Sequence, residues 1–390
     1  MARKRKKAAN GQGSVYPRSD GRWGYSYTVD GKQVNRACKT QAKAVERLNE
    51  ALAKIKAQTY VDPNQMLVNE WLSRWLEVYA PAKARQSTLA SYRDIIEDHL
   101  FPAFKKIQLQ KLTSEHIQRF INKQKKAGYA SGTIRRHMSV LGKAIRQAQK
   151  DKLIPFDLTK DVDLPKMEQK EIEFLTVEEI KKLLAVLPDT TNGRAIRFIL
   201  GTGIRVSELC GLRWCDVSDE GANISQIVYM VNNRALSEDE KKMERVKEAP
   251  KTSAGRRFIP FSDGTLPAIL EEQKRQQRIE RMKAGSCWIG GDPGRGEQYV
   301  FATKNGAPAD RYNLGRTLRN CLDNAGLKRR GLHALRHTFA TLWIQAGQDV
   351  RTLSEILGHT SVSFTMQRYV HSDTATKKRG MAVMASYLAE

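Results

Sequence analysis

The spacing of apolar residues changes along this chain of 390 residues, and each change marks a different kind of structure. Between residues 14 and 37, β-forming residues alternate with polar ones, and Asp-Gly pairs at 20–21 and 30–31 interrupt the run. Asp-Gly is a preferred hairpin turn, so this stretch predicts a three-stranded antiparallel sheet. Thr40 is a good N-cap, and the helical spacing that follows it predicts a helix over 41–58.

The next hundred residues show helical spacing throughout. After a linker at Asp62-Pro63-Asn64, helices are expected over 66–79, 87–100, 114–127 and 131–150. In the last of these, the apolar residues recur at steps of four and three, which is typical of a helix with one buried face. These residues are Ile134, Met138, Leu141, Ile145 and Ala148.

The rest of the chain mixes both patterns. A linker at 155–165 precedes a capping box at Thr176, and apolar strands are expected over 224–231 and 257–260. The charged residues 233–250 between these strands predict an exposed insertion. A charged helix over 267–282 and further helices from Tyr312 onward complete the pattern.

These patterns predict a multidomain chain, mainly α with small β-sheets (α+β). The expected parts are a disordered basic arm (1–10), a three-stranded sheet plus helix (11–62), an all-helical domain (66–160), a linker (161–173), and a mixed helical domain with a β-hairpin (174–390) that ends in an apolar tail (378–390).

The charge of the chain points to a polyanionic partner. Its 67 Lys and Arg against 42 Asp and Glu give a net charge of +25. The excess is densest toward the N-terminus, with 14 basic against 5 acidic residues over 1–65 and 18 against 10 over 66–165. Residues 166–390 hold 35 against 27. Ribosome-binding proteins and RNA-modifying enzymes carry such a charge, as DNA-binding proteins do, so the charge alone does not identify the function.

Composition excludes several other classes. No apolar run approaches the ~18–20 residues of a membrane-spanning helix, so no membrane role is expected. The basic residues 3–7 are followed by no apolar segment, which argues against a secretory signal. The five cysteines are scattered and form no Cys-x-x-Cys pair, which favours reduced thiols over a disulfide framework or a zinc site.

A first cluster of interest follows a glycine-rich turn. Arg205 comes directly after Gly201-Thr202-Gly203-Ile204 and begins a helical run, a position suited to binding an anion. Taken alone, a surface arginine paired with Glu208 explains the pattern equally well.

Two further clusters carry histidines. The spacing of His333 and Arg336 places both on one face of a helix. Gly358 ends another helix and exposes His359 at the turn, and Tyr369 follows ten residues later. Taken singly, each of these has an ordinary structural explanation.

Together the clusters resemble the tyrosine recombinase (phage integrase) family in order and approximate spacing. The resemblance is carried by Gly203–Leu209, His333–Thr341, Leu357-Gly358-His359 and Tyr369. It implies a site-specific DNA recombinase that integrates and excises a mobile genetic element through a 3′-phosphotyrosyl intermediate. As a DNA strand-transferase of this family, the chain is expected to need neither a metal nor ATP nor another cofactor.

The resemblance also implies the catalytic residues, which are Arg205, Lys251, His333, Arg336, His359 and Tyr369, with Glu208 as an orienting or capping partner. Tyrosine has a pKa of ~10, so a nucleophilic Tyr369 needs nearby cations and a proton acceptor, for which His333 is the candidate. Two guanidiniums, Arg205 and Arg336, can hold the nonbridging phosphate oxygens. His359 would hydrogen-bond the phosphate, and Lys251 would protonate the leaving 5′-oxygen.

Two other histidines, His337 and His371, are interpreted as structural. No clustered carboxylates suggest a two-metal site, which argues against a metal-dependent nuclease.

The N-terminal parts are expected to bind DNA. The sheet resembles the arm-type DNA-binding module of integrases, and residues 66–160 look like a helical core-binding (SAM-like) domain. The candidate DNA-binding residues of the sheet are Arg18, Arg22, Lys32 and Arg36. Those of the helical domain are Arg135, Arg136, Lys143 and Arg146.

The family implies double-stranded DNA as the partner, at core-type and arm-type sites, a homotetramer on DNA, and DNA-bending accessory proteins. A bacterial cytoplasmic location, at the nucleoid when bound to DNA, is expected. The tail at 378–390 either packs on its own domain or docks on a neighbouring subunit. Two alternatives stay open: a type IB topoisomerase-like relaxing enzyme, and a catalytically silent DNA-binding regulator of the same fold.

Overall fold

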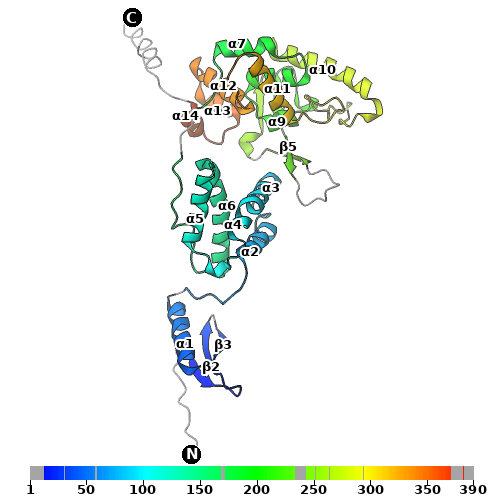
Figure 1. The fold of residues 1–390 in the computed structure, drawn as a ribbon. Coiled ribbons are helices and arrows are strands. Elements are labelled where there is room, and N and C mark those ends of the chain that lie inside the picture. The colour runs from blue at the N-terminus through cyan, green and yellow to red at the C-terminus, as the bar shows by residue number, and fades with distance from the viewer. Residues whose placement is uncertain are drawn as a thin grey trace, which may run out of the picture. The chain divides into compact units, whose positions relative to one another are not determined.

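The computed structural model describes residues 13–29, 31–57, 59–167, 172–232, 243–250, 252–262, 264–292, 294–369 and Met381. The expected arm at 1–10, Lys251, His371 and all of the tail except Met381 lie outside these ranges. The chain divides into two compact units, Met1–Gln169 and Lys170–Glu390 (Figure 1). No helix among the described residues is long and apolar enough to cross a membrane.

The first unit begins with the expected sheet. Its strands β1 (Ser14–Pro17), β2 (Trp23–Val29) and β3 (Lys32–Cys38) pair antiparallel in the order β1-β2-β3. Gly21 and Gly31 both have a φ of +77°, the left-handed conformation that the two Asp-Gly turns require. The predicted turns therefore set the register of the sheet.

One helix packs against this sheet. Helix α1 (Gln41–Lys56) begins where Thr40 Oγ1 accepts a hydrogen bond from the Lys43 amide, which confirms the predicted cap. Tyr27 of the sheet and Leu48 and Ala51 of α1 are buried together. One sheet face thus has a helix to cover it.

The remainder of the first unit is helical. The helices are α2 (Val68–Arg74), α3 (Gln86–Ile95), α4 (Phe101–Phe104), α5 (Ser114–Lys126) and α6 (Ser131–Lys150), with π-helical turns η1 (Trp75–Tyr79) after α2 and η2 (Ile96–Leu100) after α3. All five residues of the apolar stripe predicted for α6 are buried. Trp71 of α2 is fully buried and donates from Nε1 to the Ala144 carbonyl at 2.9 Å, so α2 and α6 share a core.

The second unit combines helices with two small sheets. Its helices are α7 (Val177–Val186), α8 (Thr191–Thr202), α9 (Val206–Gly211), α10 (Thr265–Ala284), α11 (Arg311–Asn324), α12 (Leu332–Gln345), α13 (Val350–Leu357) and α14 (Val362–Tyr369). Its strands are β4 (Gly221–Ile224), β5 (Ile227–Asn232), β6 (Met243–Glu248) and β7 (Arg257–Pro260). Helix α8 contributes fully buried Phe198 and Ile199 to the main core of the unit. The α+β fold class predicted from the sequence is confirmed.

Two sequence predictions in this unit are wrong. The single strand expected over 224–231 is two strands, β4 and β5, that pair with different partners: β4 with β7, and β5 with β6. A third of the expected insertion is the strand β6, in which Val246 is buried while Glu244, Arg245 and Lys247 are exposed. The high charge of this segment indicated a loop, but a strand with one solvent-facing side can also be rich in charged residues. Residues 233–242 lie outside the described ranges.

Candidate active site

Arg205 is held at a sharp turn between two helices. Helix α8 ends at Gly203, whose φ is +64° and on which a Cβ would lie 2.6 Å from the Phe339 ring. Arg205 is then the N-cap of α9, and its amide donates to Glu208 Oε2 at 3.0 Å. The backbone of Arg205 is therefore fixed on both sides, while a third of its side chain stays exposed (34%).

Glu208 lies behind Arg205 and is only 2% exposed. Its carboxylate accepts hydrogen bonds from Arg205 Nη1 at 2.8 Å and from both terminal nitrogens of Arg257 at 2.8 and 3.1 Å. Burial pushes the pKa of Glu208 up, but Arg257 and Arg205 outweigh it and hold this pKa below its ordinary value. Glu208 is thus a buried anion that hydrogen-bonds both the backbone amide and the guanidinium of Arg205.

Arg336 of α12 is buried almost completely (2% exposed). Its Nη1 donates to the Gly203 carbonyl at 2.7 Å, and its Nη2 donates to the Leu357 carbonyl at 2.6 Å. Burial, and then the neighbouring Arg205, lower the pKa of Arg336 to about 9, so the guanidinium is still charged at pH 7. Through these two hydrogen bonds, Arg336 links the turn before Arg205 to the C-terminal end of α13.

His359 follows the αL glycine Gly358 that ends α13. Its Nε2 lies 3.0 Å from Arg336 Nη2, and its Nδ1 lies 2.7 Å from Thr365 Oγ1. Burial, followed by the charges of Arg336 and Arg205, lowers the pKa of His359 to about 3, so the ring is neutral. Because a guanidinium can only donate, Nε2 accepts here and Nδ1 carries the proton.

Tyr369 ends α14 with its hydroxyl 2.7 Å from His337 Nδ1, and both side chains are buried. Burial raises the pKa of Tyr369, while Arg336, Arg368 and Arg205 act in the opposite direction. Burial and the adjacent His333 lower the pKa of His337 to about 4. At neutral pH, His337 is therefore uncharged, and a neutral imidazole can accept a hydrogen bond at one of its ring nitrogens.

His333 lies one helical turn before His337, with the ring centroids 4.5 Å apart. Burial and the charge of Arg336 lower the pKa of His333 as well. The sequence predicts His333 as the proton acceptor and a structural role for His337. In the structure, His337 is the histidine whose Nδ1 lies within hydrogen-bond distance of the Tyr369 hydroxyl.

The structure brings together Arg205, Glu208, His333, Arg336, His359 and Tyr369, and adds Arg257 and His337. Two cavities of about 340 and 310 Å³ adjoin this cluster, and Arg205 lines both of them. Among the described residues, no group of His, Cys, Asp and Glu is arranged to hold a metal ion.

These observations fit a known family. Residues 173–376 match the phage integrase family, and residues 67–124 match the N-terminal SAM-like domain of phage integrases. The chain belongs to the phage integrase family.

Named relatives and solved structures agree with this assignment. A tyrosine recombinase XerC-like protein of Caldanaerobacter subterraneus subsp. tengcongensis is 29% identical over 342 residues, covering 85% of this chain and 86% of the relative. An integrase of Saccharopolyspora erythraea is 24% identical and covers 95% of both chains.

The fold is also shared with two integrases solved on DNA. The Tn1549 transposon integrase bound to a circular intermediate DNA superposes with a TM-score of 0.66 at 18% identity, covering 82% of this chain and 99% of that one. A lambda integrase dimer on a core site gives a TM-score of 0.59 at 18% identity, covering 96% and 99%.

The candidate DNA-binding residues of the sheet differ in how they are held. Arg18 and Arg22 pair with Asp20 at 3.4 and 2.7 Å, so both lie at the β1–β2 turn. Lys32 and Arg36 are exposed on β3. Arg36 lies opposite Tyr25 in the register and so shares its sheet face.

The four candidate DNA-binding residues on α6 all make hydrogen bonds or ion pairs with other residues of the chain. Arg135 donates to the Pro165 carbonyl at 2.8 Å, Arg136 to Ser91 and Lys143 to Tyr92, and Arg146 lies 3.6 Å from Asp157. Lys143 and Arg146 also line a cavity of about 300 Å³ with Trp75, Tyr79 and Tyr92. These contacts hold the basic face of α6 in place.

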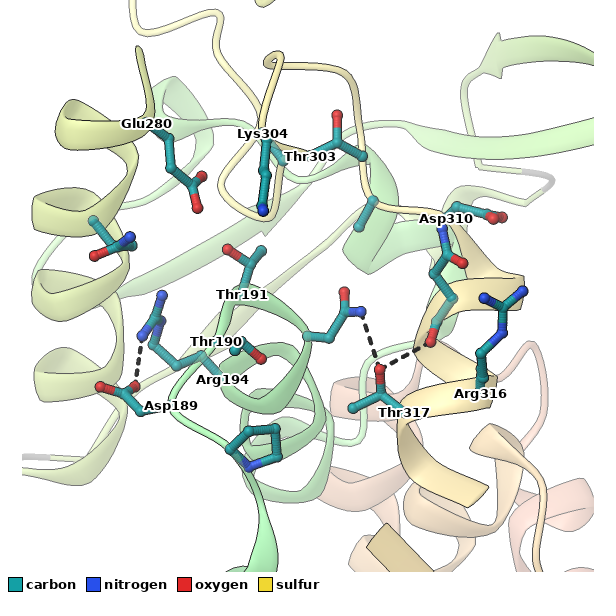
Figure 2. A pocket seen from close by; sticks show the side chains of 16 residues that line it. Asp189, Thr190, Thr191, Arg194, Glu280, Thr303, Lys304, Asp310, Arg316 and Thr317 are labelled. Carbon is teal, nitrogen blue, oxygen red and sulfur yellow. Dashed lines mark hydrogen bonds and ion pairs between the residues drawn. The ribbon is translucent and has the colours of Figure 1, made fainter. Parts of the chain in front are cut away.

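A separate cavity of about 710 Å³ lies at the N-terminal end of α8 (Figure 2). Arg194 pairs there with Asp189 at 2.5 Å, and Asn192 donates to Thr317 at 3.1 Å. Gly203 and Arg205 follow the other end of this 12-residue helix, about 18 Å away at ~1.5 Å per residue. Among the residues that the structure describes, none of those predicted to be catalytic lines this cavity.

Proposed function

We propose that this chain is a site-specific DNA recombinase that cleaves and rejoins DNA through Tyr369, to integrate and excise a mobile genetic element. The observation that carries the proposal is the 2.7 Å hydrogen bond between the Tyr369 hydroxyl and His337, beside the two guanidiniums of Arg205 and Arg336. A nucleophile with an uncharged acceptor, next to fixed cations, is the arrangement that phosphoryl transfer requires.

In the proposed step, the Tyr369 oxygen attacks the scissile phosphorus and its proton passes to His337 Nδ1. The bond from phosphorus to the 5′-oxygen breaks, which leaves a 3′-phosphotyrosyl link and a 5′-hydroxyl. We assign protonation of the leaving oxygen to Lys251, on the family resemblance alone. Because the phosphodiester energy is kept in the new link, another 5′-hydroxyl can reverse the step without ATP.

Arg205, Arg336 and His359 are proposed to hold the nonbridging oxygens. Arg205 is the more accessible cation, and Arg336 is anchored by two backbone carbonyls. Preorganised donors of this kind stabilise transition-state charge without reorganising during the reaction. His359 would donate from Nε2 after a change of tautomer, which its partner Thr365 permits because a hydroxyl can both donate and accept. His333, which contacts His337, would tune that acceptor.

We also propose how the parts of the chain bind DNA and how many copies assemble on it. Residues 11–62 would bind arm-type DNA sites, 66–160 core-type sites, and 174–390 would carry out catalysis, with the tail 378–390 docked in cis or in trans. The match of 67–124 to the SAM-like domain supports the middle assignment. A lambda integrase tetramer bound to a Holliday junction shares the fold, with a TM-score of 0.58, and supports a homotetramer on DNA.

The relatives named above are bacterial proteins, which supports action in the bacterial cytoplasm, at the nucleoid when bound to DNA. Accessory DNA-bending proteins are proposed as further partners.

A supercoiled plasmid with two copies of a binding site, selected from a randomised duplex pool, tests the function. A recombinase yields recombined circles of predictable size. Relaxed circles without recombinants would indicate a type IB topoisomerase-like enzyme. Unchanged plasmid, despite site-specific binding, would indicate a silent regulator.

A further inference from the structure

Three consecutive carbonyls at the end of α13 each accept a hydrogen bond from a different arginine. Arg257 Nε donates to the Ile356 carbonyl, Arg336 Nη2 to Leu357 at 2.6 Å, and Arg205 Nη2 to Gly358 at 2.9 Å. The last carbonyls of a helix lack intrahelical partners and carry its partial negative charge, so three cations are favourable there. The arginines therefore fix the turn from which His359 projects.

Two of these arginines belong to the proposed catalytic set, and Arg257 does not. Arg257 begins β7, and its side chain is 7% exposed. It fills the space beside Gly358, where an added Cβ would lie 2.9 Å from Arg257 Nη1. The side chain therefore contacts the turn directly but lies deeper in the fold than the exposed edge of Arg205.

Arg257 and Arg205 share one carboxylate. Arg257 holds both oxygens of Glu208, and Arg205 Nη1 donates to Oε1 of the same group. Without Arg257, the full charge of buried Glu208 would fall on Arg205 and compete with a phosphate for it. With Arg257 in place, that charge is divided, and Arg205 keeps positive charge for the DNA.

We propose that Arg257 is a positioning residue for DNA cleavage. It acts through Glu208 on Arg205, and through the Ile356 carbonyl on the turn that carries His359. The proposal rests on the recombinase function proposed above. A buried ion pair is weak evidence for added stability, so the specific geometry, rather than the pairing, carries the inference.

The test measures single-turnover covalent adduct formation on a nicked suicide duplex that carries the selected site, together with DNA affinity. Arg257→Gln is expected to slow adduct formation about 10²-fold, the cost of a misplaced catalytic group, while the dissociation constant for DNA stays within about twofold. Arg257→Lys keeps the charge but cannot hold Glu208 bidentately and also reach Ile356, so at least a tenfold loss is expected.

Arg213→Gln is the matched control. Arg213 is a half-buried arginine of the same unit that pairs with Asp216 at 2.9 Å and also donates to Ser225, neither of which belongs to the cluster. Its loss is expected to leave the adduct rate unchanged. If Arg257→Gln does not fold, the Arg257→Lys comparison carries the test.

An Arg205→Lys background separates positioning from general stabilisation. Because Arg257 acts in part through Arg205, adding Arg257→Gln to Arg205→Lys is expected to slow the reaction by no more than about tenfold, which is the share that acts through the turn carrying His359. A full further 10²-fold loss, or Arg257 variants as fast as Arg213→Gln, would overturn the proposal. Absence of adduct with the unmodified chain would instead reject the recombinase function itself.

Discussion

His337 of α12 and Tyr369 of α14 are joined by a 2.7 Å hydrogen bond between the imidazole Nδ1 and the phenolic oxygen. The residue before His337 is Arg336, which contacts the turn on which His359 lies. One helix therefore supplies both the proposed proton acceptor, His337, and one of the cations proposed to bind the phosphate, Arg336. Chemistry at Tyr369 depends on how α12, α13 and α14 pack, rather than on any single loop.

Replacement of His337 is expected to slow DNA cleavage. His337→Ala removes the proton acceptor and should lower the single-turnover adduct rate by about 10²–10⁴-fold, the usual contribution of a general base. The rate is measured on a nicked suicide duplex with a selected site. A rate within threefold of the unmodified chain would remove His337 from the mechanism and favour His333 as the acceptor.

Stability is expected to fall with acidity below pH ~6.5. The pKa of His337 is lowered to about 4 and that of His359 to about 3, so the unfolded chain binds more protons than the folded chain in this range. The free energy of unfolding should therefore drop as pH falls from about 6.5 to about 4. Urea midpoints at pH 7 and pH 5 measure the effect.

Two variants identify the histidines responsible. In the double variant His337→Gln/His359→Gln, the pH dependence should be weaker than in the unmodified chain. His137, whose pKa is lowered to about 4 in the other unit, keeps its own share of the effect. His116→Gln preserves the capping box of α5 and serves as the control. An unaltered slope in the double variant would contradict the assignment.

Gly358 is expected to tolerate no side chain. Gly358 and Gly326 have similar φ values, +65° and +67°. A Cβ added to Gly358 would lie 2.8 Å from the Ala254 carbonyl oxygen, whereas a Cβ added to Gly326 would have no neighbouring atom within 4 Å. Gly326→Ala should cost only the αL strain, about 1–2 kcal/mol. Gly358→Ala should cost more and also slow adduct formation. Equal losses of stability and activity in both variants would show that the contact at Gly358 is unimportant.

Exposed cations of the sheet are expected to matter for recombination and not for cleavage. Arg36→Ala combined with Arg22→Ala should leave adduct formation on a short core duplex unchanged but weaken plasmid recombination. Each lost phosphate contact should lower the salt slope of arm-DNA binding by about one. Lys283, an exposed lysine in the last turn of α10, lies outside the two parts proposed to bind arm-type and core-type sites and provides a Lys283→Ala control. Equal loss in both assays would argue against a separate arm-binding module.

Local patterns predicted the elements well where the chemistry of one segment decides the structure. The Asp-Gly turns placed the sheet, and the stripe from Ile134 to Ala148 placed α6 with its bounds. The apolar run 224–231 predicts one strand, but β4 ends at Ile224 and β5 begins at Ile227, and the two strands pair with different partners. Pairing across the chain is a tertiary property that a local pattern does not contain.

The candidate site shows the same difference between what local motifs predict and what only the tertiary structure reveals. Family motifs located Arg205, Arg336, His359 and Tyr369, and the structure brings them together. The contact between His337 and Tyr369 joins residues 32 positions apart, so the sequence carries no local signal for it. The contacts of Arg257 arise only where β7, α9 and α13 meet. Residues whose role depends on three elements leave no local signal.

The most direct test of the account is the covalent link itself. The unmodified chain is incubated with a nicked suicide duplex that carries a selected site, and the products are separated on a denaturing gel. We expect a protein–DNA adduct whose phosphate is attached to Tyr369, and its complete loss in Tyr369→Phe. An adduct that persists in Tyr369→Phe, or no adduct on any duplex that the chain binds specifically, would contradict it.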